Sequence, residues 1–185
     1  MDRHWVPARV GDALGDVDTP ALIVDLDKFD ANLRHLMQAV AGRNVRVRPH
    51  AKSHKCVAIA QRQVAAGAVG ICVQKTSEAE PFLAGGIEDV LVTNEVIGDR
   101  KLARLAGLAA RFPAARLGVC VDDANAVQKL AQACDAADTR VDVYIELDVG
   151  HNRAGVPDPG SVVMLAHAVD AQASLTLRGL HAYFG

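Results

Sequence analysis

Residues 44–55 read NVRVRPHAKSHK, and this stretch decides how the rest of the chain is interpreted. Val45 and Val47 alternate with polar residues, which predicts a strand over residues 45–49. The turn that follows is rich in lysine, arginine and histidine, and this positive charge repels itself unless an anion binds there. Nearby cations disfavour the protonated form of Lys52, so we expect this lysine to be a good nucleophile near neutral pH. A solvated basic loop is the alternative interpretation.

Short apolar runs alternate with helical patterns along the whole chain. Strands are predicted at residues 21–25, 45–49, 70–73, 89–92, 117–121, 141–147 and 177–183. Helices are predicted at 27–40, 54–66, 76–84, 99–111, 123–136 and 161–169. The strands are apolar on both faces, as strands covered by helices are, and the chain has no glycine fingerprint for a dinucleotide. This pattern favours an α/β fold of the (β/α)8 TIM-barrel type.

The predicted barrel is incomplete. A closed barrel has eight strands and typically about 250 residues, whereas this pattern gives about six barrel strands plus an N-terminal strand. We expect residues 1–18 to form an N-terminal arm and residues 19–185 to form a partial (β/α) barrel domain. The chain is therefore expected to be the N-terminal part of a longer protein, or a truncated variant.

Composition excludes several classes of protein. The net charge is −2 over 185 residues, which argues against nucleic acid as a partner. Apolar runs stay well short of the roughly 18 residues that span a membrane. The four cysteines lack C-x-x-C spacing and are predicted to be reduced and mostly buried. These observations predict a cytoplasmic protein.

Polar side chains follow most of the predicted strands, and in a (β/α) barrel the strand ends meet at one mouth. These residues are His50, Lys52, His54, Gln74, Lys75, Thr93, Asn94, Asp122, Asp123, Asp148, His151, Asn152, Arg153, His181 and Tyr183. Such a set suits an anion and a carbonyl group, and a nucleophilic lysine suits Schiff-base chemistry with an aldehyde cofactor that carries a phosphate. Alternatives remain open for single members: a metal pair of His50 and His54, a plain turn at 148–155, and core packing for Tyr183.

Five segments resemble a known family: DTPALIVDLDKFDANL, VRVRPHAKSHK, CVQKTSEAE, ELDVGHNRAGV and GLHAYFG. In this order they are similar to the N-terminal half of D-threonine aldolases and D-serine dehydratase-like proteins. These are fold-type III pyridoxal-phosphate enzymes, the group that includes alanine racemase. The resemblance covers residues 18–185 and implies the same barrel, with a C-terminal β domain that is absent from this chain.

The resemblance also implies roles for individual residues. Lys52 corresponds to the residue that binds pyridoxal 5′-phosphate as a Schiff base, with His50 as a second catalytic residue that positions it. Arg153 corresponds to the arginine that faces the pyridine nitrogen, and Gln74 and Tyr183 to residues that line the cofactor pocket. A divalent metal (Mn, Zn or Mg) is expected in the full-length family, with ligands outside this chain, as is a glycine-rich phosphate loop.

The implied activity is that of a lyase acting on β-hydroxy D-amino acids, which cleaves D-threonine to glycine and acetaldehyde by a retro-aldol reaction. A D-serine or D-threo-3-hydroxyaspartate dehydratase is the alternative lyase, and a non-catalytic pyridoxal-phosphate-binding protein is the alternative outside catalysis. The expected partners are a small D-amino acid and a second subunit, as in a homodimer, without nucleic acid or membrane. An unclosed barrel that cannot fold alone is a further possibility.

Overall fold

The computed structural model describes residues 6–184, which divide into two compact units, one up to Ala39 and one from Val40 onward. The first unit contains the short 3-10 helix η1 (Leu14–Asp16) and the helix α1 (Leu26–Val40). The structure has no strand at residues 21–25, where the sequence predicted one, because this exposed segment has no pairing with a strand of the described residues. An apolar run alone does not make a strand when no neighbour accepts its hydrogen bonds. The domain boundary expected after residue 18 stays a prediction.

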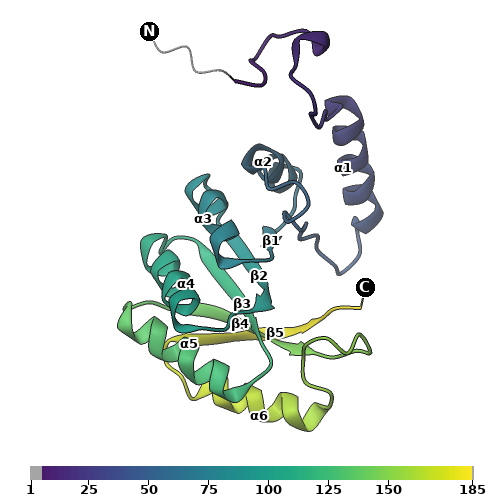
Figure 1. The fold of residues 1–185 in the computed structure, drawn as a ribbon. Helices are drawn as coiled ribbons and strands as arrows, with labels where there is room; N and C mark the ends of the chain where they lie inside the picture. The colour runs from purple at the N-terminus through teal and green to yellow at the C-terminus, as the bar shows by residue number, and fades with distance from the viewer. Residues whose placement is uncertain (1–5, 185) are drawn as a thin grey trace. The chain divides into compact units, whose positions relative to one another are not determined.

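The second unit is a parallel sheet whose successive strands are connected by helices (Figure 1). The strands are β1 (Ile71–Val73), β2 (Asp89–Glu95), β3 (Arg116–Val121), β4 (Val141–Leu147) and β5 (Leu175–Ala182), and they lie in sequence order. The helices are α2 (Val57–Ala65), α3 (Thr76–Ala84), α4 (Asp99–Arg111), α5 (Ala124–Ala136) and α6 (Pro159–Asp170). A single parallel sheet in sequence order is the pattern of a (β/α) barrel, and the predicted fold class is confirmed.

The segment that was predicted as a strand at residues 45–49 runs beside β1 without forming a full strand. The Val69 N–H donates to the Val47 carbonyl, and the Cys72 N–H donates to the Pro49 carbonyl. Past these bonds, His50 and Cys72 form an isolated parallel bridge. Pro49 has no N–H to donate, so the ladder of hydrogen bonds is interrupted where a strand would continue.

Alternation along the strands separates an apolar face from a polar one. Side chains on the first face are buried against the helices: Val73, Val90, Val92, Val119, Val143 and Ile145. Helix α4 covers them with Leu102, Leu105 and Leu108, which repeat at helical spacing. Side chains on the second face point toward the barrel interior because successive residues of a strand face opposite sides. The polar residues of the strands therefore lie together.

In the second unit, α5 and α6 have side-chain caps that fix where they begin. Asp123 accepts a hydrogen bond from the Ala126 N–H at 2.9 Å, and Asp158 accepts one from the Ser161 N–H at 3.0 Å. Each cap satisfies an N–H that the first turn leaves without a partner, so the chain turns from strand to helix at a defined residue.

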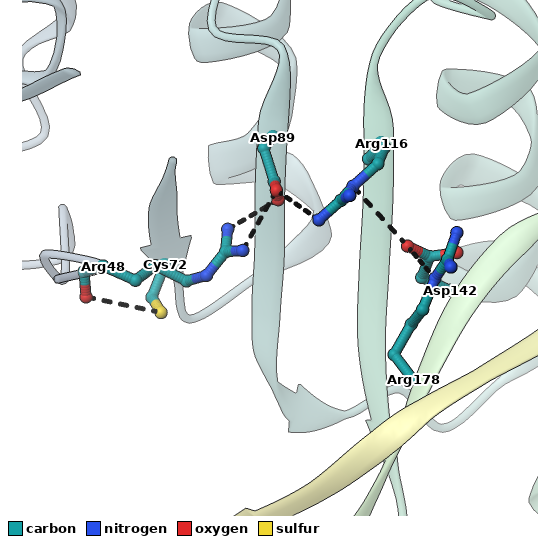
Figure 2. A network of polar contacts seen from close by, with 6 residues as sticks. All are labelled: Arg48, Cys72, Asp89, Arg116, Asp142 and Arg178. Atoms are coloured by element: carbon teal, nitrogen blue, oxygen red, sulfur yellow. Dashed lines mark hydrogen bonds and ion pairs between the residues drawn. The ribbon is translucent and has the colours of Figure 1, made fainter. Parts of the chain in front are cut away.

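Charged residues form a chain of ion pairs toward the N-terminal ends of the strands (Figure 2). Asp89 binds Arg48 through both carboxylate oxygens, at 2.6 and 3.0 Å, and also accepts from Arg116 at 2.8 Å. Asp142 lies 2.9 Å from Arg178 and 3.9 Å from Arg116. Alternating charge links the basic segment to β2, β3, β4 and β5 at this end.

Within residues 6–184, no helix is long and apolar enough to cross a membrane.

Candidate active site

Lys52 lies in a turn at the C-terminal end of β1. The Ala51 N–H donates to the Cys72 carbonyl at 2.8 Å, and Ala51 is buried, so the turn is anchored directly beside the strand. The Lys52 amine then donates to Oε1 of Gln74, the residue that follows β1, at 3.4 Å. Two of the predicted site residues thus lie in contact.

His50 holds the backbone of this turn through a chain of hydrogen bonds. Its Nδ1 accepts from the Lys52 backbone N–H at 3.2 Å, and its Nε2 lies 2.9 Å from the Thr93 hydroxyl. That hydroxyl also donates to the Val73 carbonyl at 3.3 Å, so it accepts from His50, and the proton of a neutral imidazole is on Nε2. Burial, reinforced by the charge of Lys52, lowers the pKa of His50 and favours this neutral form.

Two of the other cations in this stretch, Arg48 and Lys55, are paired with carboxylates, which offsets part of the expected repulsion. Arg48 is paired with Asp89, and Lys55 lies 3.2 Å from a Glu78 carboxylate oxygen. His54 accepts from the Cys56 N–H at 3.0 Å through Nδ1. Carboxylates from later segments offset charges that are adjacent in sequence, and the sequence stretch alone could not show them.

Arg153 is placed by a loop between β4 and α6. Oδ1 of Asp148 accepts from the backbone N–H groups of Gly150 and Asn152, at 2.9 and 3.0 Å. The Gly155 N–H donates to Oδ2 of Asp122 at 3.0 Å, which ties the loop to the end of β3. The predicted turn at 148–155 is therefore a structured loop that carries Arg153 to the mouth of the sheet.

Tyr183 follows β5 and receives Arg153 on its ring face. The guanidinium carbon of Arg153 lies 4.9 Å from the Tyr183 ring centre, a cation–π contact, and His151 meets the same ring edge-on at 5.3 Å. Tyr183 is 40% exposed, so it is not a core residue in this structure. The alternative of core packing does not describe it.

These residues surround one cavity of about 140 Å³ at the C-terminal ends of the strands. Its lining consists of Arg48, His50, Lys52, Cys72, Gln74, Thr93, Arg153, His181 and Tyr183. All five residues to which the resemblance gave a role, His50, Lys52, Gln74, Arg153 and Tyr183, are among them. Burial raises the pKa of Cys72 to about 11, so this thiol is protonated at neutral pH and does not compete with Lys52 as a nucleophile. His54, assigned to the same mouth, does not line this cavity.

His181, which lines this cavity, belongs to a group whose other two members the sequence did not single out. Nδ1 of His181 is hydrogen-bonded to Oε2 of Glu146, and the Cys120 thiol lies beside them. Glu95 of β2 is a further acid near this group, and burial, with the charges of Asp122 and Glu146, raises its pKa. The signal in the sequence was Glu146 itself, an acid that alternation turns to the face opposite Val143 and Ile145, toward the interior.

A parallel sheet with its strands in sequence order, and polar side chains gathered at its C-terminal mouth, defines the class: a TIM-barrel protein. The chain belongs to the family described as "Alanine racemase, N-terminal domain", whose family model matches residues 24–185. Members related to this chain are pyridoxal-phosphate-dependent.

Individual relatives narrow the resemblance further. The chain is 49% identical over 180 residues to a D-threonine aldolase of Arthrobacter sp., covering 97% of this chain and 46% of that protein. The crystal structure of a D-threonine aldolase from Filomicrobium marinum superimposes with a TM-score of 0.90 at 51% identity, over 96% of this chain and 47% of that one. A D-threo-3-hydroxyaspartate dehydratase from Delftia sp. HT23 gives 0.79 at 32% identity, over 90% and 43%. The chain thus spans about half the length of the relatives it matches.

Proposed function

We propose that this chain carries the lysine-bearing half of a pyridoxal-phosphate-dependent lyase that cleaves β-hydroxy D-amino acids, D-threonine to glycine and acetaldehyde. The observation that carries the proposal is the Lys52 amine, which enters a single cavity together with Gln74, Arg153 and Tyr183. The similarity to D-threonine aldolases over nearly the whole chain supports the choice of substrate.

The residues of the cavity fit this cofactor chemically. Arginine, lysine and histidine line it, and no carboxylate is among its lining residues within the described part of the chain. An anionic aldehyde is therefore attracted, and a primary amine is present to bind its carbonyl carbon. When bound, pyridoxal phosphate supplies an electron-withdrawing ring that stabilises negative charge at the substrate Cα.

Each side chain then has a defined task. Lys52 would hold the cofactor through its amine, which lies in the cavity beside Gln74. Gln74 orients the Lys52 amine through Oε1, and His50 positions the lysine by holding its backbone N–H. Arg153 and Tyr183, stacked on each other, line the same cavity and would place positive charge beside the cofactor. In the cleavage the β-hydroxyl loses its proton, the Cα–Cβ bond breaks, acetaldehyde leaves, and Cα gains a proton to give glycine.

The decisive experiment is covalent trapping on Lys52. The chain is incubated with pyridoxal phosphate, reduced with borohydride and digested, and the modified lysine is found by mass spectrometry. We expect the label on Lys52 and its loss in K52A. Lys55 is three residues away and paired with Glu78, so K55A is the matched control and keeps the label. Labelling spread evenly over surface lysines would contradict the proposal.

The reaction itself separates two lyases. With D-threonine and Mn²⁺, acetaldehyde and glycine indicate the aldolase, whereas ammonia and a 2-keto acid indicate a dehydratase, the alternative favoured by the likeness to the Delftia enzyme. Trapping on Lys52 without turnover of any D-amino acid indicates a cofactor-binding protein. The proposal also includes a divalent metal, whose ligands lie outside this chain, and a homodimer. It further includes a cytoplasmic location, which the four free cysteines support.

A further inference from the structure

We propose that Cys120, Glu146 and His181 form a binding site for a thiophilic divalent cation, of the zinc type, inside the barrel. Their ligand atoms, the Cys120 thiol sulfur, a Glu146 carboxylate oxygen and a His181 ring nitrogen, all lie within 4.8 Å of one another. This site needs neither pyridoxal phosphate nor substrate, so it stands independently of the proposed lyase activity.

The sheet register brings the three residues together. Glu146 of β4 is paired directly with His181 of β5, and Cys120 of β3 is paired with Tyr144, two residues before Glu146. Residues two apart on a strand share a face, so all three side chains project from adjacent strands toward the same interior layer. Rigid strands hold ligands more firmly than loops do, because their backbone positions are fixed by the hydrogen-bond ladder.

The donor set is one that zinc uses. Thiolate, imidazole and carboxylate ligands bind zinc at about 2.0–2.3 Å in tetrahedral geometry, which places ligand atoms on the order of 3–4 Å apart. The three donors here lie within 4.8 Å of one another, so side-chain rotations that also open the Glu146–His181 hydrogen bond would bring them into range. Three protein ligands leave the fourth position open, and His181 lines the cavity that contains Lys52, so this position is reached from the cavity.

Local charge and burial favour a cation. Cys120 is 1% exposed and Glu146 is 5% exposed, so the carboxylate has little water to stabilise its charge. Glu95 of β2 and Cys120 line the same small cavity, so a further carboxylate lies near the thiol. A dication would offset these carboxylates, and its binding would deprotonate the Cys120 thiol. A hydrogen-bonded Glu146–His181 pair beside an ordinary buried thiol is the competing explanation.

The test is a titration of the chelator-treated chain with Co²⁺, a spectroscopic substitute for zinc, without pyridoxal phosphate. We expect binding to saturate at one ion per chain with tetrahedral d–d bands and a thiolate-to-cobalt charge-transfer band. Excess Zn²⁺ should remove both. In C120S the charge-transfer band should be lost, and in H181A the affinity should fall at least about 10-fold.

Cys134 provides the matched control, since it is equally buried but lies in α5 against the helical layer. C134S should keep the spectrum of the wild type. A charge-transfer band that persists in C120S, or no saturable binding by the wild-type chain, would overturn the proposal. Zinc X-ray absorption of the wild-type chain gives an answer that needs no variant: one sulfur with nitrogen and oxygen ligands supports the site, and oxygen and nitrogen alone contradict it.

Discussion

His50 positions Lys52 through the lysine's backbone N–H and not through its side-chain amine. Its two ring nitrogens have opposite roles, Nδ1 accepting from the Lys52 backbone and Nε2 bonding to the Thr93 hydroxyl. A protonated imidazole would have a donor on both nitrogens, and the bond from the Lys52 N–H would be lost. The neutral form that burial favours is thus the form that keeps the turn in place.

Stability should therefore depend on pH through His50. Its pKa is lowered in the folded chain, so below about 6.5 the unfolded chain takes up a proton that the folded chain resists. We expect thermal stability to fall as the pH is lowered from 7 to 5, and H50Q to show a shallower fall. H167Q, which replaces an exposed histidine of α6, should keep the wild-type slope. Equal slopes in the wild type and H50Q would rule out this role for His50.

Asp89 should be the most sensitive member of the ion-pair chain, because its carboxylate accepts two hydrogen bonds from Arg48 and a third from Arg116. The Arg48 and Asp89 side chains are each 18% exposed, so D89N leaves a half-buried guanidinium without its charged partner. We expect a loss of about 1.5–3 kcal/mol in the free energy of unfolding, measured with urea. E80Q breaks the exposed pair with Arg111 and should cost less than about 1 kcal/mol. Similar losses in both variants would contradict this ranking.

At the level of residues, the sequence predicted Lys52, Gln74, Arg153 and Tyr183 because each follows a strand, and strand ends meet in a barrel. It did not predict their partners. Asp89 neutralises Arg48 across 41 positions, and such long-range pairings depend on register, which composition and spacing do not encode. The Cys120, Glu146 and His181 group was missed for the same reason.

At the level of elements, the loop from Asp148 to Gly155 has a backbone conformation that favours glycine at two positions. Gly150 and Gly155 both have positive φ, +113° and +98°. A Cβ at Gly155 would lie 2.6 Å from the Asp148 nitrogen and 2.8 Å from the Leu147 carbonyl carbon, whereas at Gly150 the nearest atom is a Phe184 ring carbon at 3.4 Å. The loop therefore packs closely against β4 at Gly155, next to the bridge between Val156 and Leu147, and not at Gly150.

The two glycines make a paired test. G150A introduces mainly backbone strain, and we expect a cost of about 1–3 kcal/mol in the free energy of unfolding. G155A adds overlap with the backbone of β4, so it should cost at least about 1 kcal/mol more and displace Arg153 from Tyr183. Urea unfolding of both variants measures the difference. A smaller loss in G155A than in G150A would show that the loop does not need this close approach.

The elements that periodicity predicted best are those with a complete apolar face, such as α4 and β4, whose observed bounds match the predicted ones. The failures at residues 21–25 and 45–49 have a common physical cause. A strand is defined by its neighbours, and one segment has no strand pairing in the described residues while the other is interrupted by a proline. Local sequence shows which residues favour extended backbone, but it does not show where a partner strand lies.

At the scale of the whole sheet, the two edges differ. Residues 47–51 bond along part of β1 and shield that edge. At the other edge, β5 pairs only with β4 among the strands of residues 6–184, and its Leu180 side chain is 55% exposed. A long edge strand with free backbone groups and an exposed apolar residue is a surface on which another chain can pair.

We therefore expect this chain to self-associate through β5 as its concentration rises, which sedimentation velocity would detect as a mass above that of the monomer. L180K places a charge on the edge and should shift the distribution toward the monomer. Edge-to-edge pairing would bury this lysine, which opposes association. I97K is the matched control, because Ile97 is 60% exposed in the loop between β2 and α4, away from that edge. It should leave association unchanged. A monomer at every concentration, or equal effects of the two lysines, would show that the β5 edge does not drive association.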